Sequence, residues 1–335
     1  MAKTNSLPII ILCMAPLLIC FSIVLSILYG AKNIDSITVW NAIFHYDSSN
    51  VDHAIIMASR LPRVLGALLV GAFLAISGAL MQGMTRNYLA SPSIMGVTDG
   101  SAFVITLCMV FAPGMSSFQM ILFSMLGSAL GAGIVFGFGS LLPNGLSPVR
   151  LAIIGTVIGT FLSSISAAIA SYFQISQNVS FWYNSRLHQI DPNVLKLAIP
   201  CGMVGIILAL FISKSITILS LGEEISINLG QRTKVIKAVT LLSVICLTGI
   251  AVALVGKIGF VGLIIPHITR FLIGIDYKWI VPCAGVIGAV FLALCDVLSR
   301  FVNYPFETPI GVVTSLIGIP FFLYLIRTRG GEKNG

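Results

Sequence analysis

The side chains that most often perform catalysis are sparse in this sequence of 335 residues. Its histidines, His45, His53, His188 and His267, lie far apart in different contexts. The sequence contains no HExxH zinc motif, no GxSxG nucleophile motif and no phosphate-binding GxxxxGK[ST] loop. Its seven cysteines all lie in apolar runs without CxxC spacing, a pattern typical of small buried side chains. We therefore expect this chain to perform no catalysis and to hold no metal ion or cofactor.

Charged residues inside apolar runs are the next candidates for chemistry, because a charge is costly in lipid and is often functional there. Asp99, Lys257 and Asp296 lie in such runs. An ion-coupled secondary transporter would use residues of this kind as proton or sodium sites. All three fall near the expected ends of apolar segments, where they can reach water. We therefore interpret them as solvated or helix-capping charges.

Two further charges stand at the start of the apolar run expected over 63–84. The stretch SRLPRVLGALLVG (59–71) places Arg60 and Arg63 around a proline. Pro62 suits the first turn of a helix, where its missing N–H has no partner to lose. The arginines are therefore expected at the N-terminus of a helix. Their role depends on the side of the membrane that this N-terminus faces.

The composition indicates that these residues are positioned by a membrane protein. The chain is 57% hydrophobic and only 9% charged, so it cannot cover a water-exposed surface. Its net charge of +8 is scattered between apolar runs, which argues against nucleic acid as a partner. The sequence predicts an all-α polytopic protein, a single transmembrane domain over 1–335 in one bundle. The expected spans are 8–29, 63–84, 94–112, 118–141, 150–173, 195–213, 236–255, 258–274, 279–299 and 309–327.

The distribution of lysine and arginine sets the orientation of these spans. With a cytoplasmic N-terminus, twelve Lys and Arg residues lie inside and seven lie outside. This bias predicts that both termini are cytoplasmic. Arg60, Arg63 and Arg300 then lie at the outer face, against the general rule, and we expect them to be exposed there.

Two hydrophilic segments stand out between the spans. The outer segment 30–62 mixes polar and aromatic residues and is expected to lie on the membrane surface as a partly amphipathic lid. The cytoplasmic loop 214–237 contains LGEEISINLGQR (221–232). Two acids in the first turn and a terminal glycine predict a short helix over about 221–230. Ile225 and Leu229, four residues apart, share one face of it.

Five stretches together resemble a known family. They are SRLPRVLGALLVGAFLAISGALMQGMTRNYLASPSIMGVTDG (59–100), LGEEISINLG (221–230), GKIGFVGLIIPHITR (256–270), DVLSR (296–300) and ETPIGVVTSLIGIPFFLYLI (307–326). In order and coverage they resemble the permease subunits of ABC importers for iron–siderophores, haem and cobalamin, and are nearest to the ferric hydroxamate (ferrichrome) branch. That family has ten transmembrane helices per subunit.

The resemblance implies a set of partners. They are a second permease subunit, here expected to be a different homologous chain, two cytoplasmic ATPases that bind ATP and Mg, and a binding lipoprotein or periplasmic protein outside the cell membrane. By resemblance, Arg60 and Arg300 dock the binding protein and Arg63 supports the same region. The ATPase-coupling residues are Leu221, Gly222, Glu223, Glu224, Ile225, Leu229 and Gly230.

The resemblance also places a gate near the cytoplasm, in TRNYLASPSIMG (85–96), with Asn87, Leu89 and Pro92 as its residues. The sequence departs from the family here. Tyr88 stands where proline is usual, and Ser91 stands where an acid is frequent.

The sequence thus predicts a non-enzymatic permease subunit in the bacterial inner or plasma membrane, with lipid as its solvent. Its expected cargo is a ferric siderophore of the hydroxamate type, which travels already chelated and needs no iron ligand from this chain. Import of haem or cobalamin is the alternative within the family, and an ion-coupled secondary transporter is the alternative from another class.

Overall fold

The computed structural model describes residues 6–30, 34–142, 147–184, 187, 190–304 and 306–330, and these form an all-helical protein. Each of the ten predicted spans corresponds to one described helix. Seven helices are long and apolar enough to cross a membrane, and three apolar helices are shorter. The ten are α1 (Ser6–Leu28), α4 (Leu61–Thr85), α5 (Val97–Phe111), α6 (Ser117–Leu141), α7 (Pro148–Tyr172), α9 (Pro192–Leu221), α11 (Thr233–Val255), α12 (Val261–Ile273), α13 (Tyr277–Ser299) and α14 (Ile310–Gly330).

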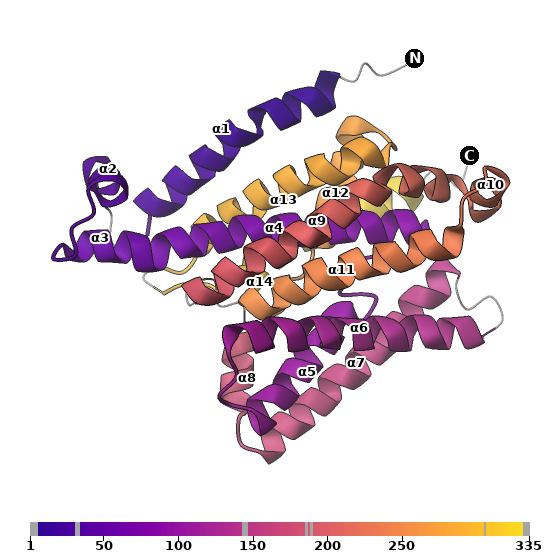
Figure 1. The fold of residues 1–335 in the computed structure, drawn as a ribbon, viewed down its shortest axis with the longest axis horizontal. Coiled ribbons are helices and arrows are strands. Elements are labelled where there is room, and N and C mark those ends of the chain that lie inside the picture. Colours follow the sequence, from indigo (N-terminus) through magenta and orange to yellow (C-terminus); the bar gives the residue numbers. More distant parts are fainter. Residues whose placement is uncertain are drawn as a thin grey trace.

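The helix α4 forms the centre of the bundle, and nearly all of its side chains are buried (Figure 1). It packs against α13, α11, α9 and α12, while α5, α6 and α7 pack against one another and, through α5 and α6, against α11. Small residues allow the closest of these contacts: a Cβ atom added to Gly71 of α4 would lie 2.2 Å from the Gly288 carbonyl oxygen of α13. Such close packing of small residues is how helices associate in lipid, where the hydrophobic effect contributes little.

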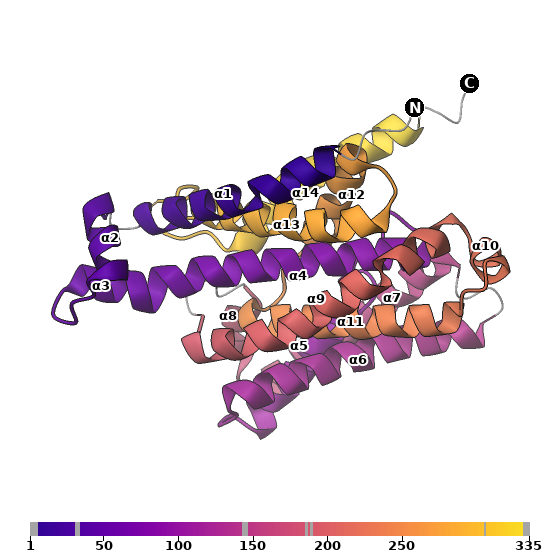
Figure 2. The same ribbon diagram turned by 45° about the horizontal axis from the view of Figure 1, so that its top comes forward.

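Shorter helices lie at the two ends of the bundle. Residues 34–60 contain α2 (Ser36–Phe44), α3 (Val51–Ile55) and a π-helical turn over Ile56–Arg60. Figure 2 shows α2 and α3 at one end and α10 (Glu223–Asn228) at the opposite end, the end at which α1 begins and α14 finishes. The start of α1 and the end of α14 thus lie at the same end of the bundle, as an even number of membrane crossings requires.

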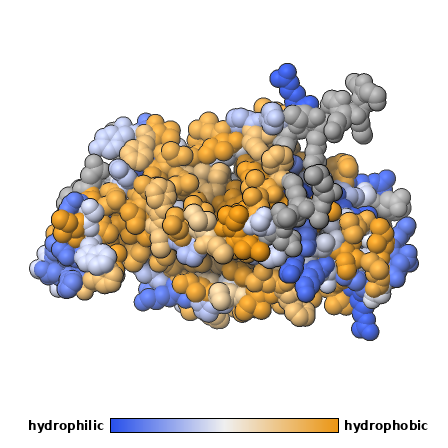
Figure 3. All heavy atoms as spheres, turned by 90° about the horizontal axis from the view of Figure 1, so that it is seen from above, coloured by the Kyte–Doolittle hydropathy of each residue, from blue (hydrophilic) through white to orange (hydrophobic). Residues whose placement is uncertain are grey.

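The surface between these ends is apolar. Figure 3 shows a broad hydrophobic band flanked by hydrophilic residues at both ends of the molecule. Phe161 on α7, Phe211 on α9 and Leu323 on α14 are all more than half exposed. Exposed side chains of this kind require an apolar solvent, so the lateral surface faces lipid or other membrane-embedded chains.

Candidate functional site

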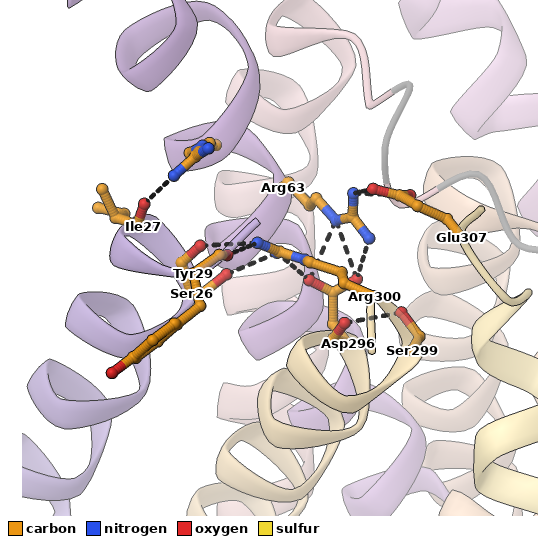
Figure 4. Close-up of polar contacts among 9 residues, drawn as sticks. Ser26, Ile27, Tyr29, Arg63, Asp296, Ser299, Arg300 and Glu307 are labelled. Atoms are coloured by element: carbon orange, nitrogen blue, oxygen red, sulfur yellow. Dashed lines mark hydrogen bonds and ion pairs between the residues drawn. The ribbon is translucent and has the colours of Figure 1, made fainter. Parts of the chain in front are cut away.

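Arg60, Arg63, Asp296, Arg300 and Glu307 lie near the end of α1, at the α2–α3 end of the bundle, which is the outer end in the predicted orientation. Figure 4 shows the labelled side chains among them. Arg63 donates from Nε to Asp296 Oδ1 at 2.9 Å and from Nη1 to Glu307 Oε1 at 2.8 Å. Arg300 pairs with the other Asp296 oxygen and donates to the carbonyl oxygens of Ser26 and Tyr29, both at 2.7 Å. The cluster therefore ties α1, α4 and α13 together. We call Arg63, Asp296, Arg300 and Glu307 the outer charge cluster.

The third arginine, Arg60, approaches the same region through the π-helical turn. The Leu61 N–H donates to the Ile56 carbonyl five residues earlier, which widens the turn. Pro62 follows in the first turn of α4, as the sequence predicts. Its ring needs space at the carbonyl four residues before it, and a widened turn supplies that space. The guanidinium of Arg60 then donates to the Ile27 and Leu28 carbonyls at the end of α1.

The expectation that these three arginines are exposed is wrong. Arg60, Arg63 and Arg300 are 7%, 8% and 6% exposed. The carboxylates and the carbonyl oxygens at the end of α1 hold the guanidinium groups inside the protein, where a buried charge needs such partners. Their burial limits direct contact between these arginines and a binding protein in this conformation. Their role in docking stays a prediction.

The interpretation of Asp296 as a solvated charge is also wrong. Its side chain is 1% exposed and faces two guanidinium groups. One part of this arrangement could have been recognised in the sequence, since Asp296 and Arg300 have the i,i+4 spacing of a helical ion pair. The contact with Arg63 joins residues 233 positions apart and leaves no local signal.

At the opposite end, α10 occupies the predicted short cytoplasmic helix. Gly222 precedes it with φ +147° and Gly230 follows it with φ +78°, so glycine bounds the helix on both sides as expected. Four apolar side chains on and around it are exposed: Leu221, Ile225, Ile227 and Leu229. An exposed apolar group of this size, bounded by charged residues, is typical of a surface that another protein covers.

Glu223 and Glu224 lie in the first turn of α10, as predicted. Lys237 of α11 donates to Glu223 at 2.7 Å and fixes the helix against the bundle. This hydrogen bond is the main cause that holds the pKa of Glu223 below its usual value. Glu224 is exposed beside it. The role of α10 in coupling stays a prediction.

The predicted gate residues lie in the turns between α4 and α5, next to the first residue of α7. Asn87 donates to the Pro148 carbonyl at 3.4 Å and accepts from the Leu89 N–H at 2.9 Å. Leu89 is exposed, while Pro92 is buried and its carbonyl accepts from the Val97 N–H at 3.0 Å.

The sequence departure at residue 88 has a structural consequence. The Tyr88 ring lies 4.2 Å from the Arg270 guanidinium of α12, a cation–π contact. Arg270 also donates to Gln82 of α4 and to Tyr277 of α13. The segment is thereby held to three helices at the inner end, and its function as a gate stays a prediction.

The two remaining charged residues of the apolar runs, Asp99 and Lys257, form an ion pair. Lys257 Nζ lies 2.6 Å from Asp99 Oδ1, although 158 positions separate the two residues. Sequence reasoning treated them as separate capping charges and missed the pair. Within the part of the chain that the structure describes, no group of three or more His, Cys, Asp and Glu side chains has a metal-binding arrangement.

Comparisons with known proteins agree with this architecture. Residues 17–328 match the FecCD transport family. The chain is 61% identical over 326 residues to the iron-uptake system permease protein FeuB of Bacillus subtilis, covering 97% of this chain and 98% of that protein. It is 51% identical over 319 residues to the iron(3+)-hydroxamate import system permease protein FhuB of the same organism, covering 95% and 83%.

A solved structure shows the same fold. It is described as an inward-facing conformation of a metal-chelate type ABC transporter, and it superposes with a TM-score of 0.81 at 30% identity, covering 96% of this chain and 99% of that one. The resemblance noted in the sequence is thus confirmed at the level of the family. The chain belongs to the FecCD transport family and is a multi-pass bacterial membrane permease, the non-catalytic transmembrane subunit of an ABC importer.

Proposed function

We propose that this chain moves ferric siderophores from an extracytoplasmic binding protein into the cytoplasm, and that its cargo is of the hydroxamate type. The match to two iron-uptake permeases over nearly the whole chain carries the proposal. The relative with 61% identity is named for iron uptake alone, and the hydroxamate assignment rests on the one with 51% identity. Relatives named for ferric enterobactin and for hemin are more distant, at 35% and 33% identity.

The exposed apolar group at α10 supports an assembly in which this chain forms the permease and a separate chain binds ATP. We propose that Leu221, Gly222, Glu223, Glu224, Ile225, Leu229 and Gly230 form the surface that docks an ATPase subunit. ATP and Mg²⁺ then bind the ATPase, and this chain has no cofactor of its own. Because one bundle presents one such helix, two permease chains are needed to engage two ATPases. We propose a different homologous chain as the second permease.

The outer end supports a second docking surface. We propose that Arg60, Arg63 and Arg300 attract acidic groups on a binding protein, with Asp296 and Glu307 holding Arg63 and Arg300 in position. Charge attraction of this kind steers a partner and sets its register. We also propose that Asn87, Leu89 and Pro92 belong to the inner gate, since the turns that carry them contact the start of α7.

Uptake of radiolabelled cargo tests the proposal. In a strain lacking its own importers, the complete transporter should accumulate ferric hydroxamates faster than ferric catecholates, haem or cobalamin. Preferred uptake of another cargo would contradict the hydroxamate assignment. Uptake that survives deletion of the ATPase gene but stops when the proton gradient is collapsed would contradict the ABC mechanism and favour the ion-coupled alternative.

A further inference from the structure

One intramembrane ion pair has no role in the docking surfaces described above. Lys257, in the loop between α11 and α12, contacts Asp99 of α5 at 2.6 Å and Ser163 of α7 at 2.9 Å. Ser163 in turn donates to Asp99 at 3.0 Å. The side chains of Lys257 and Asp99 remain 25% and 20% exposed, so the pair reaches the surface of this chain. We call Lys257, Asp99 and Ser163 the polar triad.

The polar triad lies deep in the membrane-spanning region. Ser163 is nine residues before the end of α7 at Tyr172, and Asp99 is twelve residues before the end of α5 at Phe111. At 1.5 Å per residue these distances are about 14 and 18 Å along the helices. The hydrocarbon core of a bilayer is about 30 Å thick, so the polar triad lies close to its middle.

The backbone is shaped to place these groups. A Cβ atom on Gly159 of α7 would lie 2.6 Å from Asp99 Oδ2, so the glycine leaves room for the carboxylate in the position that it occupies. Gly256, directly before Lys257, has φ +76° and packs against the Trp182 carbonyl oxygen. Phe260 at the end of the same loop has φ +68°, which is rare for a residue other than glycine. Positions of this kind persist where the surrounding structure enforces them, often at functional sites.

Two hollows open beside the polar triad. The first has a volume of about 520 Å³. Its lining includes the Asp99 carboxylate and the hydroxyl-bearing side chains of Ser93, Thr156, Thr160, Ser163 and Ser164. The second has a volume of about 390 Å³ and includes Lys257, Tyr183, Asn184 and Ser315 of α14. Intramembrane charges normally face a water-filled cavity or the interior of a bundle rather than lipid. This surface therefore fits the wall of a transport pathway.

We propose that Lys257 is a cargo contact within the pathway, and that it donates to the oxygen-rich, electron-rich surface of a ferric chelate. This inference rests on the proposed function. Hydroxamate, catecholate and carboxylate oxygens bound to iron come from deprotonated groups and accept hydrogen bonds from an ammonium group. Asp99 and Ser163 are positioning residues: they hold the ammonium at the wall. Asp99 also balances its charge, which keeps the contact weak enough for release.

The test uses the complete importer in nanodiscs and in proteoliposomes. The probes are radiolabelled ferrichrome, an uncharged ferric trihydroxamate, and ferric enterobactin, a tris-catecholate with three negative charges. Lys257→Met should weaken binding of an imported chelate by about twofold to fivefold, the range of a partly exposed charge contact. The loss should be larger for the anionic chelate, and Lys257→Arg should restore most of the affinity. Lys278→Met, which removes an exposed lysine from α13, is the matched control.

A purely structural ion pair would behave differently. The double variant Lys257→Met with Asp99→Asn removes both charges, so neither charge is left without its partner. It should fold as well as the unsubstituted chain and still bind the chelate more weakly. Unchanged affinity for both chelates, equal losses for the two, or no detectable binding to the unsubstituted importer would overturn the proposal. An unsubstituted importer that transports neither chelate would instead contradict the proposed function.

Discussion

At the end of the bundle that carries α2 and α3, charged side chains neutralise one another inside the protein, whereas at the α10 end apolar side chains are left exposed. Asp296 is 1% exposed between two arginines. Leu229 beside α10 is 63% exposed and Ile225 on it is 46% exposed. The charges of the first arrangement are paired within one chain, whereas the apolar side chains of the second are left uncovered by the described part of the chain.

This difference bears on how each end can bind. An apolar surface that must be covered favours a lasting contact, since its burial removes hydrocarbon from water. An end whose charges are already paired offers weaker attraction, which suits a partner that leaves in every transport cycle. We therefore expect substitutions at the outer charge cluster to affect folding first and docking second, and the reverse at α10.

The largest effect is expected for Asp296→Asn. The change leaves Arg63 and Arg300 facing a neutral amide, and loss of one partner from a buried ion pair costs about 3–5 kcal/mol. Thermal unfolding of the purified chain in detergent should show the loss. Glu307→Gln is the matched control, because Glu307 is 38% exposed and its pair with Arg63 contributes about 1 kcal/mol or less. Equal unfolding temperatures for the two variants would show that the buried Asp296 contributes no more to stability than the partly exposed Glu307.

A smaller effect, and on assembly rather than folding, is expected for Leu229→Asp. Burial of a leucine side chain contributes about 2 kcal/mol, so its loss should weaken ATPase binding by about 30-fold. Co-purification and titration of the ATPase would measure this. Asn228→Asp adds the same charge one position earlier and should have little effect. Normal ATPase binding by the Leu229→Asp chain would remove this residue from the docking surface.

A weaker effect is expected for Arg60→Gln on the affinity for the binding protein. Arg60 contacts backbone carbonyls of α1, so its removal leaves the outer charge cluster intact. We expect a loss of at most about fivefold, concentrated in the association rate and diminishing as salt is added. Arg86→Gln, at the inner end of α4, should leave this affinity unchanged. An association rate independent of residue 60 at low salt would exclude Arg60 from steering.

The smallest effect concerns pH and the attachment of α10. The pKa of Glu223 is lower in the folded chain than its usual value of 4.5 because Lys237 donates to it. The stabilisation is therefore fully present above about pH 4.5 and is lost as pH falls through the lower, folded value. Both side chains are at least 30% exposed, so the contribution stays below about 1 kcal/mol after solvent screening.

Hydrogen exchange of the α10 amides, measured from neutral pH to below the usual Glu223 pKa of 4.5, would report on the contact between Glu223 and Lys237. Protection should decrease at acidic pH in the unsubstituted chain and should vary less in a Glu223→Gln variant. The Glu224→Gln chain, altered at the neighbouring exposed acid, should retain the decrease. A pH dependence that survives Glu223→Gln would assign it to another group.

The sequence was sufficient for the spans because hydropathy acts locally: every apolar stretch became a helix, and Pro62 and Gly230 marked boundaries that the structure retains. The pairing of charges could not be predicted in the same way. Arg63 meets Asp296, and Lys257 meets Asp99, only after distant helices pack together. The sequence therefore predicts that Arg60, Arg63 and Arg300 are exposed and that Asp296 is solvated. Packing of the helices buries all four side chains. Docking surfaces are harder still to predict from one sequence, because this chain contributes only one of the two surfaces that would meet.

The outer charge cluster also constrains the order in which the protein can be completed. Arg63 is synthesised early, but Asp296 and Glu307 leave the ribosome more than 230 residues later. Until then the arginine side chain has to remain at the lipid headgroups, beside phosphates that can accept its hydrogen bonds. A chain that ends before α13 would keep that cation without its carboxylates. The outer charge cluster can therefore form only after α13 and Glu307 have been synthesised and have packed against α4.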